Sequence, residues 1–116
     1  MKKKIKLMPD YQSYPLWWSG GSEVGNIDPV SLALGSETLY RLESWSEIYD
    51  ATLNLDDPSV SGFPDEEKEK TFEIEGINLW KQIQKELGEE FEVSYYSYRM
   101  QKLLKHPDEF ELELSP

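Results

Sequence analysis

The sequence of 116 residues contains no cysteine and only one histidine, His106. Without cysteine, neither a disulfide framework nor a thiolate nucleophile can form. A zinc site is not expected either, because zinc is usually held by several cysteine or histidine side chains. No apolar run approaches the roughly 18 residues of a membrane-spanning helix. These absences exclude several common classes of secreted, metal-dependent and membrane protein.

A secretory signal is also missing. The start "MKKKIKLMP" has the lysines of a signal peptide, but no apolar region of about 7–15 residues follows them. The sequence therefore predicts a cytoplasmic protein that does not associate with membranes.

Motifs of the common enzyme classes are lacking as well. The sequence has no G-x-S-x-G, no Gly-Lys-Ser/Thr phosphate loop and no G-x-G-x-x-G. His106 stands directly before Pro107 with no catalytic motif around it, so we interpret it as a surface residue. We predict no catalytic residue and no cofactor.

The charge is strongly acidic and unevenly distributed. The net charge is −11, yet the first eight residues carry four lysines. From Pro9 onward, 8 basic and 23 acidic residues give a net −15. Such a chain is not expected to bind nucleic acid. A negative surface can attract a basic protein partner, although it can equally serve solubility alone.

Two segments have the spacing of amphipathic helices, residues 37–53 and residues 65–87. Ser36 is the expected N-cap of the first helix. Gly76 lies in the apolar stripe of the second helix, although glycine costs about 1 kcal/mol there relative to alanine. We therefore expect another backbone to pass close to Gly76.

Apolar and polar residues alternate in three other segments, as expected of half-buried strands. They are residues 4–8, residues 90–96 and residues 109–114. The last segment is consistent with a late edge strand or with a frayed tail over 107–116.

The segment 9–35 lacks a long periodic pattern and is expected to be a long, partly ordered loop. Within it, Asp28 and Pro29 are typical of the start of a short helical turn. Residues 96–104 have helical spacing and are expected to form a short helix. The economical architecture is one α+β domain over residues 1–116, with the two long helices on one face of a small sheet.

Two adjacent tryptophans, Trp17 and Trp18, precede a double glycine in "PLWWSGG". Neighbouring side chains of an extended chain point to opposite sides, so both can enter one core only if the backbone bends. We expect one tryptophan to contact the helix layer and the other to be partly exposed as an interface anchor. Burial of both is the alternative.

Three acidic residues, Asp50, Asp56 and Asp57, gather at the end of the first predicted helix. The helix dipole is negative there, which disfavours each carboxylate by about 0.3–1 kcal/mol. Such a placement indicates either internal pairing, with Arg41 or Arg99, or a function. The functional interpretation makes these acids and the two tryptophans a partner-binding surface.

A calcium or magnesium site is the other function open to the segment from Asp50 to Asp57. Its oxygen-bearing side chains suit these ions, but their spacing is not that of an EF-hand loop. We predict no metal ion and keep an enzyme or metal-dependent domain as the alternative hypothesis.

Several segments together resemble a group of small acidic bacterial proteins. They are "KIKLMPDY", "PLWW", "GNIDP", "RLESW", "YDATLNLDDP", "SGF", "EGINLW" and "ELGEEFEVSYYS", within residues 4–97. The group is associated with immunity proteins of bacterial toxin systems, including contact-dependent inhibition. The resemblance implies a non-enzymatic inhibitor that occludes a basic, nuclease-like toxin, and it supplies no catalytic residue or cofactor. Neither the resemblance nor the sequence indicates the oligomeric state.

Overall fold

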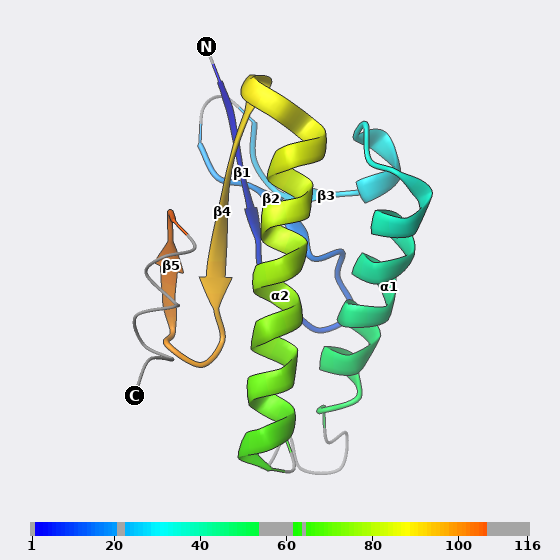
Figure 1. The fold of residues 1–116 in the computed structure, drawn as a ribbon, viewed down its shortest axis with the longest axis vertical. Helices are drawn as coiled ribbons and strands as arrows, with labels where there is room; N and C mark the ends of the chain where they lie inside the picture. The colour runs from blue at the N-terminus through cyan, green and yellow to red at the C-terminus, as the bar shows by residue number, and fades with distance from the viewer. Residues whose placement is uncertain (1, 21–22, 54–61, 64, 107–116) are drawn as a thin grey trace.

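The computed structural model describes residues 2–20, 23–53, 62–63 and 65–106. In these ranges the chain has the predicted α+β architecture of one sheet and two long helices (Figure 1). The elements in chain order are β1 (Lys3–Leu7), β2 (Leu16–Trp18), β3 (Asn26–Ile27), the 3-10 turn η1 (Pro29–Ser31), α1 (Ser36–Asp50), α2 (Glu66–Leu87), the 3-10 turn η3 (Gly88–Glu90), β4 (Phe91–Ser97) and β5 (Lys102–Leu104).

The described strands form one sheet in the order β3-β2-β1-β4-β5. The central strands β1 and β4 are parallel, and the other pairs are antiparallel. A parallel pair needs a crossover connection, and both helices lie within this one. The predicted strands at 4–8 and 90–96 and the two predicted helices are confirmed, with small shifts at their ends. The expected strand at 109–114 lies outside the described residues.

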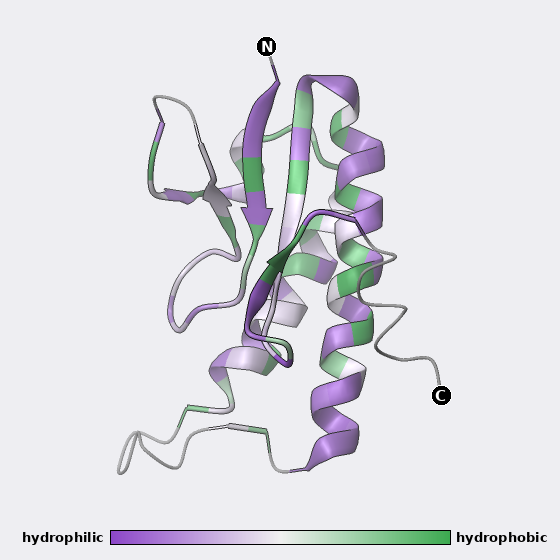
Figure 2. Cartoon of the chain, turned by 90° about the vertical axis from the view of Figure 1, so that its left-hand side faces the viewer, coloured by the Kyte–Doolittle hydropathy of each residue, from purple (hydrophilic) through white to green (hydrophobic). Residues whose placement is uncertain are grey.

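The core lies between the sheet and the helices. Ile5, Leu7 and Leu16 have no exposed surface, and their register places them on the sheet face that also carries Val93 and Tyr95. The buried apolar residues of α2 pack in this core, and Figure 2 shows hydrophobic positions spaced along the helix between hydrophilic ones. Trp45 of α1 and Trp80 of α2 are buried in this core, with 1% and 2% exposure.

Gly76 is buried on α2, where aromatic side chains rather than a backbone approach it. A Cβ atom at this position would lie 2.5 Å from the hydroxyl of Tyr95 and 2.9 Å from Cζ2 of Trp45. The predicted close approach therefore exists, but the expectation of a neighbouring backbone was wrong. The large side chains of Trp45 and Tyr95 fill the space that a larger residue would take.

The segment 9–35 contains more regular structure than the expected long loop. β2 and β3 form an antiparallel pair within it. The side chain of Asn26 accepts from the N–H of Tyr14 at 3.0 Å and donates to the carbonyl of Leu16 at 2.9 Å. The expected helical turn is the 3-10 turn η1, with Asp28 as its N-cap. Strands of two and three residues are too short to show a periodic pattern, which explains why the sequence did not reveal them.

The expected short helix over 96–104 is wrong, because a turn and the strand β5 occupy these residues. Gln101 adopts a positive φ of 54°, which ends any helical run. The buried carboxylate of Glu73 holds the turn, accepting from the hydroxyl of Ser97 at 2.9 Å and from the N–H of Arg99 at 3.2 Å. This long-range contact overrides the helical spacing of the sequence.

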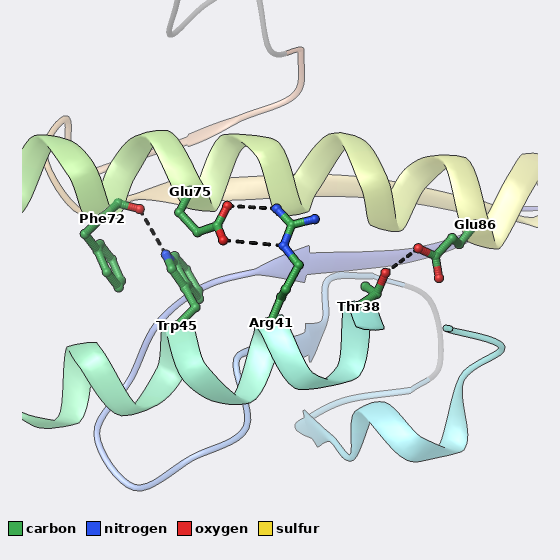
Figure 3. A network of polar contacts seen from close by, with 6 residues as sticks. All are labelled: Thr38, Arg41, Trp45, Phe72, Glu75 and Glu86. Atoms are coloured by element: carbon green, nitrogen blue, oxygen red, sulfur yellow. Dashed lines mark hydrogen bonds and ion pairs between the residues drawn. The ribbon is translucent and has the colours of Figure 1, made fainter. Parts of the chain in front are cut away.

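The N-cap of α1 is Gly35 rather than the expected Ser36. The carboxylate of Glu86 on α2 supplies the missing acceptor, binding the N–H of Gly35 at 2.6 Å and the hydroxyl of Thr38 (Figure 3). Partial burial alone raises the pKa of Glu86, but these donors, with Gln82 and Arg41, outweigh it and hold the pKa below its usual range. A neighbouring helix thus caps α1.

Candidate interaction surface

The two adjacent tryptophans lie on opposite faces of the sheet. Trp18 pairs with Ile5 and packs against the core on the helix side. Trp17 pairs with Lys6 on the face turned away from the helices, and its indole N–H donates to the carbonyl of Met8 at 3.2 Å. Both are half-buried. The strand geometry therefore separates the two side chains, and one of them contacts the helix layer as expected.

Asp50 occupies the last turn of α1 and has an internal partner. Its carboxylate accepts the backbone N–H of Gln12 at 2.9 Å, which ties the β1–β2 loop to the helix. The internal partner is therefore a backbone group and neither Arg41 nor Arg99. Arg41 pairs with Glu75, and Arg99 pairs with Glu66. Asp56 and Asp57 lie outside the described residues.

The side of α1 that faces α2 carries the single basic residue of that helix. Arg41 binds Glu75 with two hydrogen bonds, of 2.8 Å and 3.4 Å, and the indole of Trp45 donates to the carbonyl of Phe72 at 3.0 Å (Figure 3). The pKa of Arg41 is raised by its hydrogen bond with Glu75, against the effect of desolvation. The positive charge of Arg41 is therefore paired with Glu75 between the two helices.

The other side of α1 borders a hollow of about 640 Å³, which we name the α1 groove. Its walls are α1 and two segments before it, residues 13–15 and 28–30. Among the described residues that line it, four carry carboxylates and none is a lysine or an arginine. The four are Asp28, Glu43, Glu47 and Asp50.

The wall opposite α1 is held by short-range contacts. Asp28 accepts the N–H of Val30 at 3.0 Å, which fixes η1. The hydroxyl of Ser46 on α1 lies 3.4 Å from the carbonyl of Ser13, to which it donates. The contact of Ser46 with Ser13 joins the first loop segment to α1, and the bond of Asp28 with Val30 fixes the second segment locally. The groove is therefore formed by the chain alone.

A second hollow, of about 870 Å³, lies between the end of α1 and the start of α2. Its lining is largely aromatic and aliphatic and includes Ile48, Phe63 and Phe72. Lys68 lines this hollow together with acidic residues, so the hollow carries charges of both signs. The α1 groove is the more uniformly acidic of the two.

Side chains that could hold a metal ion are not clustered in the described part of the chain. Within residues 2–20, 23–53, 62–63 and 65–106, no three His, Cys, Asp or Glu side chains are arranged to hold a metal ion. His106 is exposed after β5 rather than at the end of a helix. Among the described helices, none has the length and apolar character needed to cross a membrane.

Strands β1 to β4, both long helices and the acidic groove all lie within a region that matches a known family model. The model is described as Serratia CdiI immunity protein-like and covers residues 3–98. The chain belongs to this Serratia CdiI immunity protein-like family. A search of curated proteins finds no match. Membership confirms the resemblance to immunity proteins and indicates a role in neutralising a toxin.

The matched region of this CdiI-like chain includes several groove residues that the sequence analysis overlooked. Tyr40 is 70% exposed and lies outside the apolar stripe of α1. An aromatic residue on the polar side of an amphipathic helix is a detectable signal. Glu43 and Glu47 gave no such signal, since acids are common on solvated helix faces. Their grouping depends on the tertiary position of residues 13–15 and 28–30.

Proposed function

We propose that this protein is an immunity protein that neutralises a bacterial toxin by binding to it, without a catalytic step. The observation that carries the proposal is the family match across residues 3–98, which includes both long helices and every described strand except β5. A protein of this type acts stoichiometrically, because each bound molecule blocks one toxin molecule.

The toxin is proposed to be basic and nuclease-like, with a surface that binds phosphate. Support comes from the net charge of −11 and from the acidic lining of the α1 groove. An acidic inhibitor is attracted to such a surface over long range and competes there with nucleic acid. Occlusion requires only a stable complex over the active surface, so it needs no reactive residue on the inhibitor.

The two tryptophans and the three aspartates remain proposals as partner-binding residues. Trp17 is half-buried on the sheet face opposite the helices, and Asp50 has a structural hydrogen bond as well as a place in the groove. Asp50 thus has a role in the fold and also lines the groove that we propose for partner contact.

The first step of the test is to identify a gene beside that of this protein that encodes a toxin domain, and the second is to co-express the two. Cells that express the toxin domain alone should stop growing, and cells that also express this protein should grow. A matched control uses a destabilised variant of the protein that no longer folds. If the folded protein gives no protection although it accumulates in the cell, the proposed function is wrong for that toxin.

A further inference from the structure

Apolar side chains are exposed around the α1 groove. Tyr40 is 70% exposed, Val30 is 74% exposed and Tyr14 is 49% exposed, and all three line the hollow. A single exposed apolar residue is ordinary on a protein surface. Three around one concave site have the character of an interface, where partly exposed aromatics provide most of the binding energy.

Tyr40, Glu43 and Glu47 follow one another along one side of α1. Their spacing of three and then four residues places each side chain about one helical turn from the next. Like charges at this spacing destabilise a helix by about 0.2–0.5 kcal/mol. Three ion pairs between described residues use other carboxylates, those of Glu66, Glu75 and Glu92. Folding therefore does not explain why two acids stand together here.

The groove lacks a compensating cation because Arg41 points toward α2 and binds Glu75. An external cation can supply the missing charge. Arginine suits the site best, because its planar guanidinium can stack on an aromatic ring and form two hydrogen bonds with one carboxylate. A lysine can neutralise the charge but cannot reproduce this geometry.

The geometry points to the α1 groove as the docking site for an arginine-bearing segment of the toxin. Tyr40 is the aromatic anchor of this site, and Glu43 and Glu47 are its charge partners. This inference rests on the proposed function and adds to it the surface and the chemistry of the contact. Because the backbone of the groove is already folded, this protein loses little backbone entropy when the toxin segment binds.

The experiment measures binding of the purified toxin domain from the adjacent gene to the full chain and to four variants. Glu47→Lys reverses one groove charge, and Glu89→Lys makes the same change in net charge outside the groove. Tyr40→Ala removes the anchor, and Leu103→Ala removes an exposed apolar residue from β5. Circular dichroism and thermal unfolding establish that every variant is folded.

Glu47→Lys should raise Kd about tenfold or more, mainly through slower association at low salt, and the difference from the parent should shrink at high salt. Its thermal stability should stay the same or rise, because Glu43 and a lysine at position 47 form a favourable pair. Tyr40→Ala should raise Kd by a similar factor through faster dissociation. The two control variants should bind like the parent.

Three outcomes are distinguishable. The inference is supported if both groove variants bind more weakly than the parent and both control variants bind like the parent. If the parent binds and the groove variants bind as tightly as their controls, the groove is not the docking site, although the proposed function stands. If the folded parent does not bind the toxin domain at all, the proposed function fails, and the inference fails with it.

Discussion

The carboxylate of Asp50 accepts the backbone N–H of Gln12 at 2.9 Å and thereby joins the end of α1 to the β1–β2 loop. The same loop also contacts the helix through Tyr11, whose ring stacks on Tyr49 with centroids 4.6 Å apart. An acidic residue that is unfavourable for the dipole of its own helix thus has a local structural role. Its cost to the helix is offset by a charge-assisted hydrogen bond.

Asp50→Ala should lower the free energy of unfolding by about 0.5–1.5 kcal/mol, because the exposed N–H of Gln12 exchanges its carboxylate acceptor for water. Asp50→Asn keeps an acceptor oxygen and removes the unfavourable charge, so its stability should be close to that of the parent. Urea unfolding of the three proteins measures the difference. Equal losses in both variants would show that the charge, rather than the hydrogen bond, matters at this position.

Gly76→Ala should destabilise the protein by roughly 1–3 kcal/mol through overpacking, although alanine is the better helix former by about 1 kcal/mol. The added Cβ would meet the Tyr95 hydroxyl at 2.5 Å. Combining the change with Tyr95→Phe removes that oxygen and should recover part of the loss. The measurement is a double-mutant cycle of unfolding free energies, and strict additivity would contradict this packing relationship.

Glu73 should make stability dependent on pH. Burial raises the pKa of this carboxyl, against the lowering effect of its hydrogen bonds with Ser97 and Arg99. The folded state therefore holds a proton that the unfolded state releases between the usual value of 4.5 and the raised pKa. Across that window, stability should fall as pH rises.

Glu73→Gln has no charge to bury and should lose this part of the pH dependence. Relative to the variant, the parent should be most stable at acidic pH and should lose that advantage toward neutral pH. Unfolding titrations of both proteins over this range provide the comparison. A difference that stays constant with pH would mean that Glu73 is ionised with its ordinary pKa.

The two tryptophans should differ in their effect on stability. Trp18→Ala should cost roughly 2–4 kcal/mol, since it removes a large side chain that packs against the core. Trp17→Ala should cost less, about 1–2 kcal/mol, because it mainly loses a hydrogen bond to Met8 and partial packing on the sheet face turned away from the helices. Chemical denaturation of both variants tests this order, and a larger loss for Trp17 would reverse the assignment of the faces.

The long elements could be predicted because their periodicity is a local property of the sequence. α1, α2, β1 and β4 each repeat their apolar residues often enough to show a period. β2 and β3 are too short for that, and β5 follows a segment whose helical spacing is overridden by the contact from Glu73 to Ser97. Local patterns cannot reveal a contact between residues so far apart in the chain.

The α1 groove overlaps little with the partner-binding surface predicted from the sequence. Asp50 lines the groove, whereas Trp17 and Trp18 are not among its lining residues. The remaining groove residues come from three segments that only the fold brings together. Glu43 and Glu47 look like ordinary solvated acids until residues 13–15 and 28–30 are placed opposite them.

Stoichiometric neutralisation is tested most directly by titrating the activity of the purified toxin domain with this protein. Inhibition should increase linearly, reach completion near one molar equivalent and remain unchanged with longer incubation. The Glu89→Lys variant should give the same curve. Complete inactivation by a small fraction of an equivalent, increasing with time, would show turnover by an enzyme and would contradict neutralisation by occlusion.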